Sequence, residues 1–216
     1  DFAVQHHTSG DLSEAGSIYQ QILQADPNQP VALHLLGVVS HQGGKNDIAL
    51  DLIKKAIDLR PDYPEAHNNL GNVFRELGRQ DEAVACYQKA IDIKPDFAMA
   101  HNNLGTALTE LGKPDEALVH YHKALSIKPN LVKAYVNIGI IQQGLGQLDQ
   151  AVASHHKAID IKPEFADAHN NLGNAFKELG KLDEAITSYH KSLAIKPDYS
   201  EAHSNLLFCL HYHPDM

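Results

Sequence analysis

The chain has 216 residues, 43% hydrophobic and 21% charged, so it can bury a core and is not disordered by composition. Its net charge of −9 at pH 7 argues against nucleic acid as a partner, because phosphate binding needs clustered lysine and arginine. Two cysteines are too few for a disulfide scaffold, and no apolar run approaches the roughly 20 residues of a membrane span. We therefore expect a globular protein of a reducing compartment, the cytoplasm, with neither nucleic acid nor membrane as a partner.

A repeat of 34 residues organises the sequence. Six prolines keep this spacing: Pro27, Pro61, Pro95, Pro129, Pro163 and Pro197. A glycine series beginning at Gly37 and an alanine series beginning at Ala15 keep the same step. We number each repeat so that its proline is position 32, which places small residues at positions 8, 20 and 27. Three independent series at one period are typical of a solenoid built from repeated units.

Each repeat predicts two helices, A and B. In the repeat 64–97, Ala83, Tyr87 and Ala90 fall at i, i+4 and i+7, which is one apolar stripe of helix B. Gly78 is expected to supply a left-handed turn between the helices, and Asp81 to be the N-cap of helix B, with the same roles for their equivalents. We expect one all-α domain over 1–216. Its parts are a partial repeat 1–29, full repeats 30–63, 64–97, 98–131, 132–165 and 166–199, and a half repeat 200–216.

The pattern of Leu70, Gly71, Ala83 and Pro95 resembles the tetratricopeptide repeat, or TPR. The sequence departs from that family at position 4, where histidines such as His67 replace the usual tryptophan. The resemblance implies a helix-turn-helix solenoid that coils into a right-handed superhelix and binds proteins or peptides. It also implies that helix A faces the concave surface, chiefly through positions 2, 5, 6, 9, 12 and 13.

Asparagine recurs on this expected concave surface. Position 6 is Asn69, Asn103, Asn137, Asn171 and Asn205 in five successive repeats, and position 5 adds Asn68, Asn102 and Asn170. A carboxamide carries a donor and an acceptor, so each one can clamp the N–H and C=O of an extended peptide. Val136 and Ile140 are expected to offer an apolar landing spot between these rungs. We predict that this asparagine ladder captures flexible segments without reading their side chains.

The asparagine ladder also has two interpretations that need no ligand, and both stay open at this point. Recent duplication of the repeats would leave the asparagines as inherited residues without a role. Alternatively, each amide could satisfy a polar group of a neighbouring helix inside the stack.

A narrower resemblance rests on residues 66–97, which read AHNNLGNVFRELGRQDEAVACYQKAIDIKPDF. They look like repeats of the O-linked N-acetylglucosamine transferase family, which also carries a position 6 asparagine ladder. The stretch EAHSNLLFCLHYHPDM, from Glu201 to Met216, is similar to the segment where the repeats of bacterial members lead into the glycosyltransferase domain. This resemblance implies the substrate-recruiting arm of such an enzyme. The alternative is a free-standing adaptor that self-associates and assembles protein complexes.

The last predicted helix, within 200–216, has no helix B to cover it. It carries four large apolar residues: Leu206, Leu207, Phe208 and Leu210. Position 8 is Leu207, where every full repeat has glycine. Because a solenoid end normally needs a polar cap, we predict that these residues contact either a following domain or a second copy of the chain.

Catalysis and cofactor binding are not expected. Gly43-Gly44-Lys45 lacks the earlier glycine and the following Ser or Thr of a phosphate-binding loop. Histidines at positions 4 and 25 recur a full repeat apart, too far for one zinc ion whose ligands lie about 2 Å away. Sequence neighbours such as His155 and His156 point apart on a helix. We therefore expect no metal, no cofactor and no enzymatic activity in this chain.

A carboxylate-clamp TPR, which holds an acidic C-terminal peptide, is the alternative within the same fold. That clamp needs Lys at position 5 of an early repeat, where this chain has His34 or Asn68. The expected concave positions carry the acids Glu65, Glu76, Glu110, Asp167, Glu178 and Glu201 and the bases Arg75, Lys133 and Lys177. A surface with this excess of acids disfavours acidic peptides.

Overall fold

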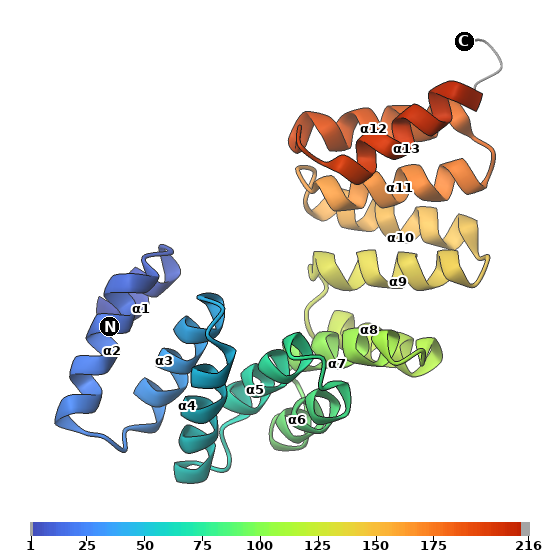
Figure 1. Ribbon diagram of the computed structural model, residues 1–216. Helices are drawn as coiled ribbons and strands as arrows, with labels where there is room; N and C mark the ends of the chain where they lie inside the picture. Colours follow the sequence, from blue (N-terminus) through green and yellow to red (C-terminus); the bar gives the residue numbers. More distant parts are fainter. Residues whose placement is uncertain (1, 213–216) are drawn as a thin grey trace. The chain divides into compact units, whose positions relative to one another are not determined.

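The computed structural model describes the backbone of residues 2–212 and the side chains of residues 5–212. Over that range it contains α-helices and no strand, which confirms the all-α fold expected from the repeat (Figure 1). The helices are α1 (Phe2–Thr8), α2 (Leu12–Ala25), α3 (Pro30–Gln42), α4 (Asn46–Leu59), α5 (Pro64–Glu76), α6 (Gln80–Ile93), α7 (Ala98–Glu110), α8 (Pro114–Ile127), α9 (Val132–Gly144), α10 (Leu148–Ile161), α11 (Ala166–Glu178), α12 (Leu182–Ile195) and α13 (Ser200–Tyr212).

The chain divides into two compact units, Asp1–Lys113 with α1–α7 and Pro114–Met216 with α8–α13. The boundary falls between the two helices of the expected repeat 98–131, so the single domain over 1–216 stays a prediction. Within each unit, every helix packs against the next one along the chain. The A helices also contact one another, α3 with α5 and α5 with α7 in the first unit, α9 with α11 and α11 with α13 in the second. Within each unit, we call the face of the A helices that carries position 6 the ladder face.

The glycine at position 8 lets each helix pair approach closely. A Cβ atom added to Gly71 would lie 2.6 Å from Cε1 of Tyr87, and one added to Gly173 would lie 2.6 Å from Cε1 of Tyr189. Both tyrosine rings are fully buried. The ring therefore packs directly on the backbone of helix A, and a larger residue at position 8 would force the pair apart.

The turns between A and B helices match the sequence in one respect and differ in another. Gly78 and Gly180 have φ of 73° and 74°, the left-handed conformation expected of them. Asp81 is not the N-cap of α6, because that residue is Arg79 and Asp81 lies in the first helical turn. The equivalent aspartates at 115, 149 and 183 also lie in the first turn of their helices. Their negative charges favour the helix start through the helix dipole rather than by capping it.

Candidate functional site

The position 6 asparagines all lie half-buried on A helices, Asn69 and Asn103 in the first unit and Asn137, Asn171 and Asn205 in the second. The position 5 asparagines lie deeper, and Asn68, Asn102 and Asn170 are all buried. The position 6 amides are therefore more accessible to a ligand than the position 5 amides.

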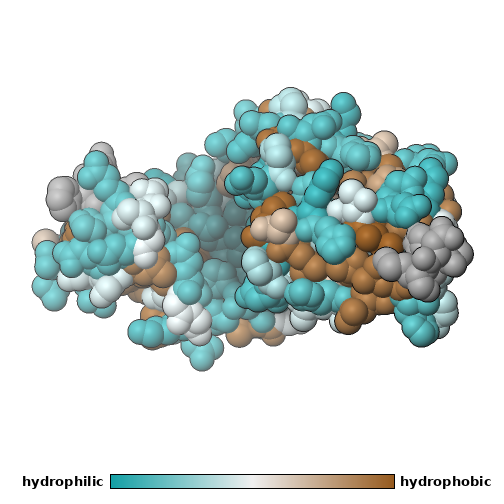
Figure 2. Space-filling model, turned by 90° about the horizontal axis from the view of Figure 1, so that it is seen from above, coloured by the Kyte–Doolittle hydropathy of each residue, from teal (hydrophilic) through white to brown (hydrophobic). Residues whose placement is uncertain are grey.

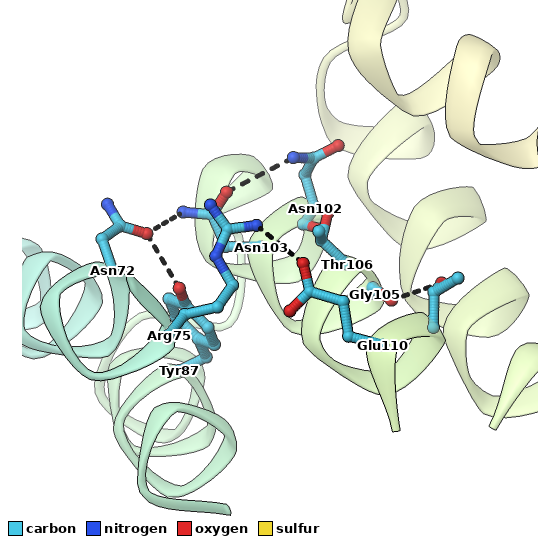
Figure 3. A network of polar contacts seen from close by, with 9 residues as sticks. Asn72, Arg75, Tyr87, Asn102, Asn103, Gly105, Thr106 and Glu110 are labelled. Carbon is cyan, nitrogen blue, oxygen red and sulfur yellow. Dashed lines mark hydrogen bonds and ion pairs between the residues drawn. The ribbon is translucent and has the colours of Figure 1, made fainter. Parts of the chain in front are cut away.

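In the first unit these amides form a connected hydrogen-bond network (Figure 3). The Nδ2 group of Asn103 donates to Oδ1 of Asn68 at 3.0 Å and to Oδ1 of Asn72 at 3.2 Å. Asn102 Nδ2 donates to Asn103 Oδ1 at 3.4 Å, and the buried hydroxyl of Tyr87 donates to Asn72 Oδ1 at 2.8 Å (Figure 3). Both N–H bonds of Asn103 are thus used inside the stack, which fixes the direction in which its carbonyl points.

The network continues from α5 to α3. Asn68 Nδ2 and Asn72 Nδ2 both donate to Asn69 Oδ1, at 3.2 and 3.4 Å. Asn69 Nδ2 then donates to Nε2 of His34 at 2.8 Å. The other ring nitrogen of His34, Nδ1, lies 2.9 Å from the hydroxyl of Tyr63. Three A helices are therefore joined by side-chain amides that end on one histidine.

His34 sets the polarity of this network. An amide nitrogen can only donate, so Nε2 of His34 accepts and the proton resides on Nδ1, which donates to Tyr63. Burial lowers the pKa of His34 to about 4, and the charge of Glu65 opposes this shift. The ring is therefore neutral at pH 7. A proton on Nε2 would face the donor of Asn69 and would require that amide to turn over.

Some hydrogen-bonding capacity remains for a ligand. Asn69 uses one of its two N–H bonds, and the carbonyl oxygen of Asn103 accepts only the long bond from Asn102. An amide oxygen has two lone pairs, so Asn103 can still accept one hydrogen bond. The two half-buried rungs of the first unit thus offer one donor and one acceptor in fixed orientations, the pair that a peptide unit needs.

The second unit arranges the same positions differently. Asn205 Oδ1 accepts from Lys177 Nζ at 3.0 Å, and Asn170 Nδ2 donates to Glu201 Oε1 at 3.0 Å. The amide of Asn171 has no hydrogen-bond partner among residues 5–212. In the second unit, Asn205 is therefore bound to a charged side chain and the amide of Asn171 is open to a ligand.

Of the two residues expected to form an apolar contact for a ligand, only Ile140 is exposed. Val136 is buried against Ala158 and Ala168, so it offers no surface to a ligand. Ile140 occupies position 9, where the first unit has Asn72, and is 45% exposed. The resemblance predicted both residues on the concave surface, but Val136 is buried, as Asn68 and Asn102 are at the same position of their repeats.

Charges on the ladder face are mostly paired. Arg75 lies 3.6 Å from Glu110 and His41 Nδ1 lies 3.3 Å from Glu76, and Gln143 donates to Glu178 at 2.5 Å. Of the three bases expected on the face, only Arg75 forms an ion pair among the described residues, and Lys177 donates to Asn205. The acids at these positions outnumber the bases in the sequence.

The four apolar residues expected to form a contact surface at the C-terminal end separate in the structure. Leu206 is buried against Tyr189 and Cys209, and Leu210 is half-buried in the same cluster. Leu207 and Phe208 are 67% and 50% exposed. Figure 2 shows apolar surface over the carboxyl-terminal helices. We call Leu207 and Phe208 the α13 patch.

A metal-ligand cluster, a membrane-spanning helix and a reactive thiol were sought in the described part of the chain. Residues 5–212 hold no group of three or more His, Cys, Asp or Glu side chains that could bind a metal ion, and no helix there is long and apolar enough to cross a membrane. Cys209 is buried, and burial raises the pKa of Cys86 to about 11, so neither thiol resembles a nucleophile.

Several members of the network were not predicted from the sequence. Asn72, Tyr87, His34 and Tyr63 were not assigned to the ladder, although all but His34 have an equivalent of the same type in the repeat 166–199 or at its end. Asn at position 9 with Tyr at position 24 was the available signal. It recurs in the second unit, where Tyr189 donates to Asn174 at 2.8 Å.

Comparison with protein families identifies the repeat. A family described as "TPR repeat" matches residues 40–78, 71–112 and 144–180, and one described as "Tetratricopeptide repeat" matches residues 98–131 and 166–199. The last two ranges have the bounds of two repeats expected from the proline spacing. No curated protein matches the chain at a significant level.

Solved structures share the fold. MamA is 31% identical, with a TM-score of 0.64 over 76% of this chain and 96% of MamA. YrrB, described as a TPR protein with an unusual peptide-binding site, is 22% identical, with a TM-score of 0.64 over 86% of this chain and 96% of YrrB. A chain of the APC/C hetero-tetramer Cut9–Hcn1 is 21% identical, with a TM-score of 0.89 over 97% of this chain. This chain spans 42% of the length of that one. The all-α solenoid expected from the sequence is thereby confirmed.

Proposed function

Because the chain belongs to the tetratricopeptide repeat family, whose members generally bind proteins or peptides, we propose that it captures extended peptide segments on its ladder face. The position 6 asparagines are the clamps in this proposal, and Asn68 and Asn102 hold the two first-unit clamps in place. The peptide backbone supplies the partner groups, so capture tolerates many sequences.

The observation that carries the proposal is the fixed orientation of the first-unit rungs. Asn69 and Asn103 are half-buried, bound to one another through Asn68 and Asn72, and each keeps one hydrogen-bonding position for a ligand. A binding site whose polar groups are already held loses little conformational entropy when the ligand arrives. Inherited asparagines without a role would not need this connected arrangement.

Spacing favours an extended ligand. Packed helices lie about 10 Å apart, and an extended chain advances about 3.3 Å per residue. One rung therefore meets roughly every third peptide residue. The acidic excess of the face predicts a preference for neutral or basic segments over acidic ones.

The test compares the wild type with an Asn103→Ala/Asn137→Ala/Asn171→Ala variant on an array of unstructured peptides. Each lost amide is expected to cost about 1 kcal/mol, so the triple variant should bind about 100-fold more weakly. A matched control is Lys89→Ala/Lys123→Ala/Lys157→Ala, which changes three exposed B-helix residues and should keep binding. Equal peptide binding by the wild type and the asparagine variant would show that the ladder does not bind the peptides.

We further propose that the chain is the recruiting arm of an O-linked N-acetylglucosamine transferase-like enzyme. Support comes from the sequence resemblance of residues 66–97 and of Glu201–Met216. The full-length gene tests this: a glycosyltransferase domain after Met216 supports it, and a stop codon there contradicts it.

The second candidate is an adaptor that self-associates through the α13 patch. The exposure of Leu207 and Phe208 favours it, because burying this apolar surface against a second copy would be favourable. Light scattering during size exclusion should then give a dimer for the wild type and a monomer for Leu207→Ser/Phe208→Ser. A monomeric wild type at every concentration would contradict self-association.

A further inference from the structure

An open pocket of about 510 Å³ lies between α2 and α3 in the first unit. Its apolar base is formed by Leu12, Leu36 and Val39, and its rim carries serine hydroxyls, Gln20 and Lys45. This volume is within the range of small-ligand pockets. We call it the α2–α3 pocket.

The same place is filled by a phenyl ring in other repeats of this chain. Phe74, at position 11 of α5, is buried, with Lys54 Nζ 5.6 Å and the Arg79 guanidinium 4.6 Å from its ring centre. Phe176, at position 11 of α11, contacts the ring of His156 on the preceding B helix at 6.3 Å. In these two repeats, a ring at position 11 therefore packs beside the preceding B helix.

The α2–α3 pocket is empty because two side chains are too small. Position 11 of α3 is Ser40, whose hydroxyl bonds to the carbonyl of Leu36 at 2.8 Å. Position 21 of α2 is Gly16, whereas other B helices carry a branched apolar residue there: Leu50, Val84, Leu118, Val152 and Ile186. A Cβ atom on Gly16 would meet Val39 Cγ1 at an ordinary 3.5 Å, so the space is open rather than closed by the backbone.

Lys45 lacks the two partners that Arg79 has at the equivalent position. Arg79, at the same position 16, stacks on Phe74 and forms an ion pair with Glu82. In the repeat 30–63 the corresponding residues are Ser40 and Ile48, and within the described range Lys45 makes no ion pair or ring contact. The pocket therefore lacks one aromatic ring and one carboxylate, and has the apolar base and the cation that hold them.

We propose that the α2–α3 pocket binds a partner protein through a phenylalanine side chain presented beside a carboxylate. The ring takes the place that Phe74 and Phe176 fill in their own repeats, and the carboxylate pairs with Lys45. The proposal does not depend on the ladder: Leu36 and Ser40, at positions 7 and 11 of α3, lie on a different side of the helix from positions 5, 6 and 9. Failure of one site would leave the other untouched.

The test titrates the whole chain with 3-phenylpropionate, which carries a phenyl ring and a carboxylate, and follows backbone amide shifts by NMR. The amides of Leu12, Gly16, Leu36 and Val39 should shift saturably, with a dissociation constant on the order of 1 mM. The ring contact with Lys45 should make 3-cyclohexylpropionate bind about threefold more weakly, and Lys45→Met should weaken 3-phenylpropionate by a similar factor.

Filling variants are the decisive controls. Ser40→Phe supplies the ring from the chain itself, and Gly16→Val supplies the branched residue of the other B helices, so each should abolish the shifts. Gly144→Val adds the same group where a Cβ would meet nothing within 4 Å, in the second unit, and should leave them unchanged. Melting curves confirm that each variant is folded.

Three results would overturn the proposal. The first is the absence of saturable shifts at the pocket, or their persistence in both filled variants. The second is equal binding of the cyclohexyl probe, which would remove the aromatic preference. The third is a concentration-dependent shift without any probe that Phe208→Ser abolishes, because the occupant would then be a second copy of the chain.

Discussion

The two units carry the same ladder positions but connect them differently. In the first, Asn69 and Asn103 are joined through Asn68 and Asn72 into one network that ends on His34. In the second, Lys177 holds Asn205, and the amide of Asn171 has no partner in the described residues. Position 6 therefore specifies only that an amide is present. Its neighbours at positions 5, 9 and 12 decide whether it is held in one orientation.

The two units also differ in their buried histidines, and the largest expected effect is on the pH dependence of stability. His34 is buried with two hydrogen-bond partners, whereas His155 is fully buried with none for either ring nitrogen. Burial, with a smaller contribution from His156, lowers the pKa of His155 to about 4. The unfolded chain binds the proton more tightly, so stability is full above about pH 6.5 and falls as pH drops towards 4. The loss should reach about 3 kcal/mol for each histidine.

The double variant His155→Tyr/Ile140→Asn tests this for the second unit alone. It installs the tyrosine–asparagine pair that Tyr189 and Asn174 form in the next repeat. Urea unfolding at pH 7 and pH 4.5 should show that the variant loses less stability on acidification than the wild type. An equal loss in both proteins would mean that His155 is not the group that binds the proton.

The next largest difference between the units is expected in the stability lost when a single position 6 asparagine is replaced. Asn103→Ala deprives Asn68 and Asn72 of a donor inside the stack and should cost about 2 kcal/mol in the free energy of unfolding. Asn171→Ala removes an amide without an internal partner and should change stability by less than about 0.5 kcal/mol. Both variants gain the same helix propensity, so the difference between their unfolding free energies isolates the network. Equal values would show that the first-unit rungs are not held together.

The smallest effect tests a feature that the units share. Tyr87 and Tyr189 each donate to a position 9 asparagine at 2.8 Å. Tyr87→Phe and Tyr189→Phe should each cost about 1 kcal/mol, by the loss of one buried hydrogen bond. Thermal unfolding of the two variants should agree. A clearly larger cost for Tyr87→Phe would extend the difference between the units to this contact as well.

Much of the fold could be predicted because it depends on spacing alone. The 34-residue period, the glycine at position 8 and the turn glycine at Gly78 act through backbone approach and backbone conformation, which one residue type dictates. The prediction of N-caps at position 18 was wrong, because an aspartate such as Asp81 is favourable both at the N-cap and within the first helical turn. Propensity alone does not separate these two places.

The candidate site was less predictable because it depends on pairs from different repeats. Asn103 bonds to Asn68 and Asn72 across a helix contact that no single repeat contains. The interpretation in which amides satisfy neighbouring helices therefore accounts for part of the first-unit network. The burial of Val136 and Leu206 likewise follows from the packing of adjacent helices, which a pattern within one helix does not reveal.

Direct observation of the rungs during binding tests the central claim. The side-chain amide resonances of Asn69, Asn103 and Asn171 can be followed by NMR while an unstructured peptide selected on the array is added. Peptide capture by the ladder predicts saturable shifts of all three, larger for the open amide of Asn171 than for the held amide of Asn103. Saturable peptide binding that leaves these three amides unmoved would contradict the account.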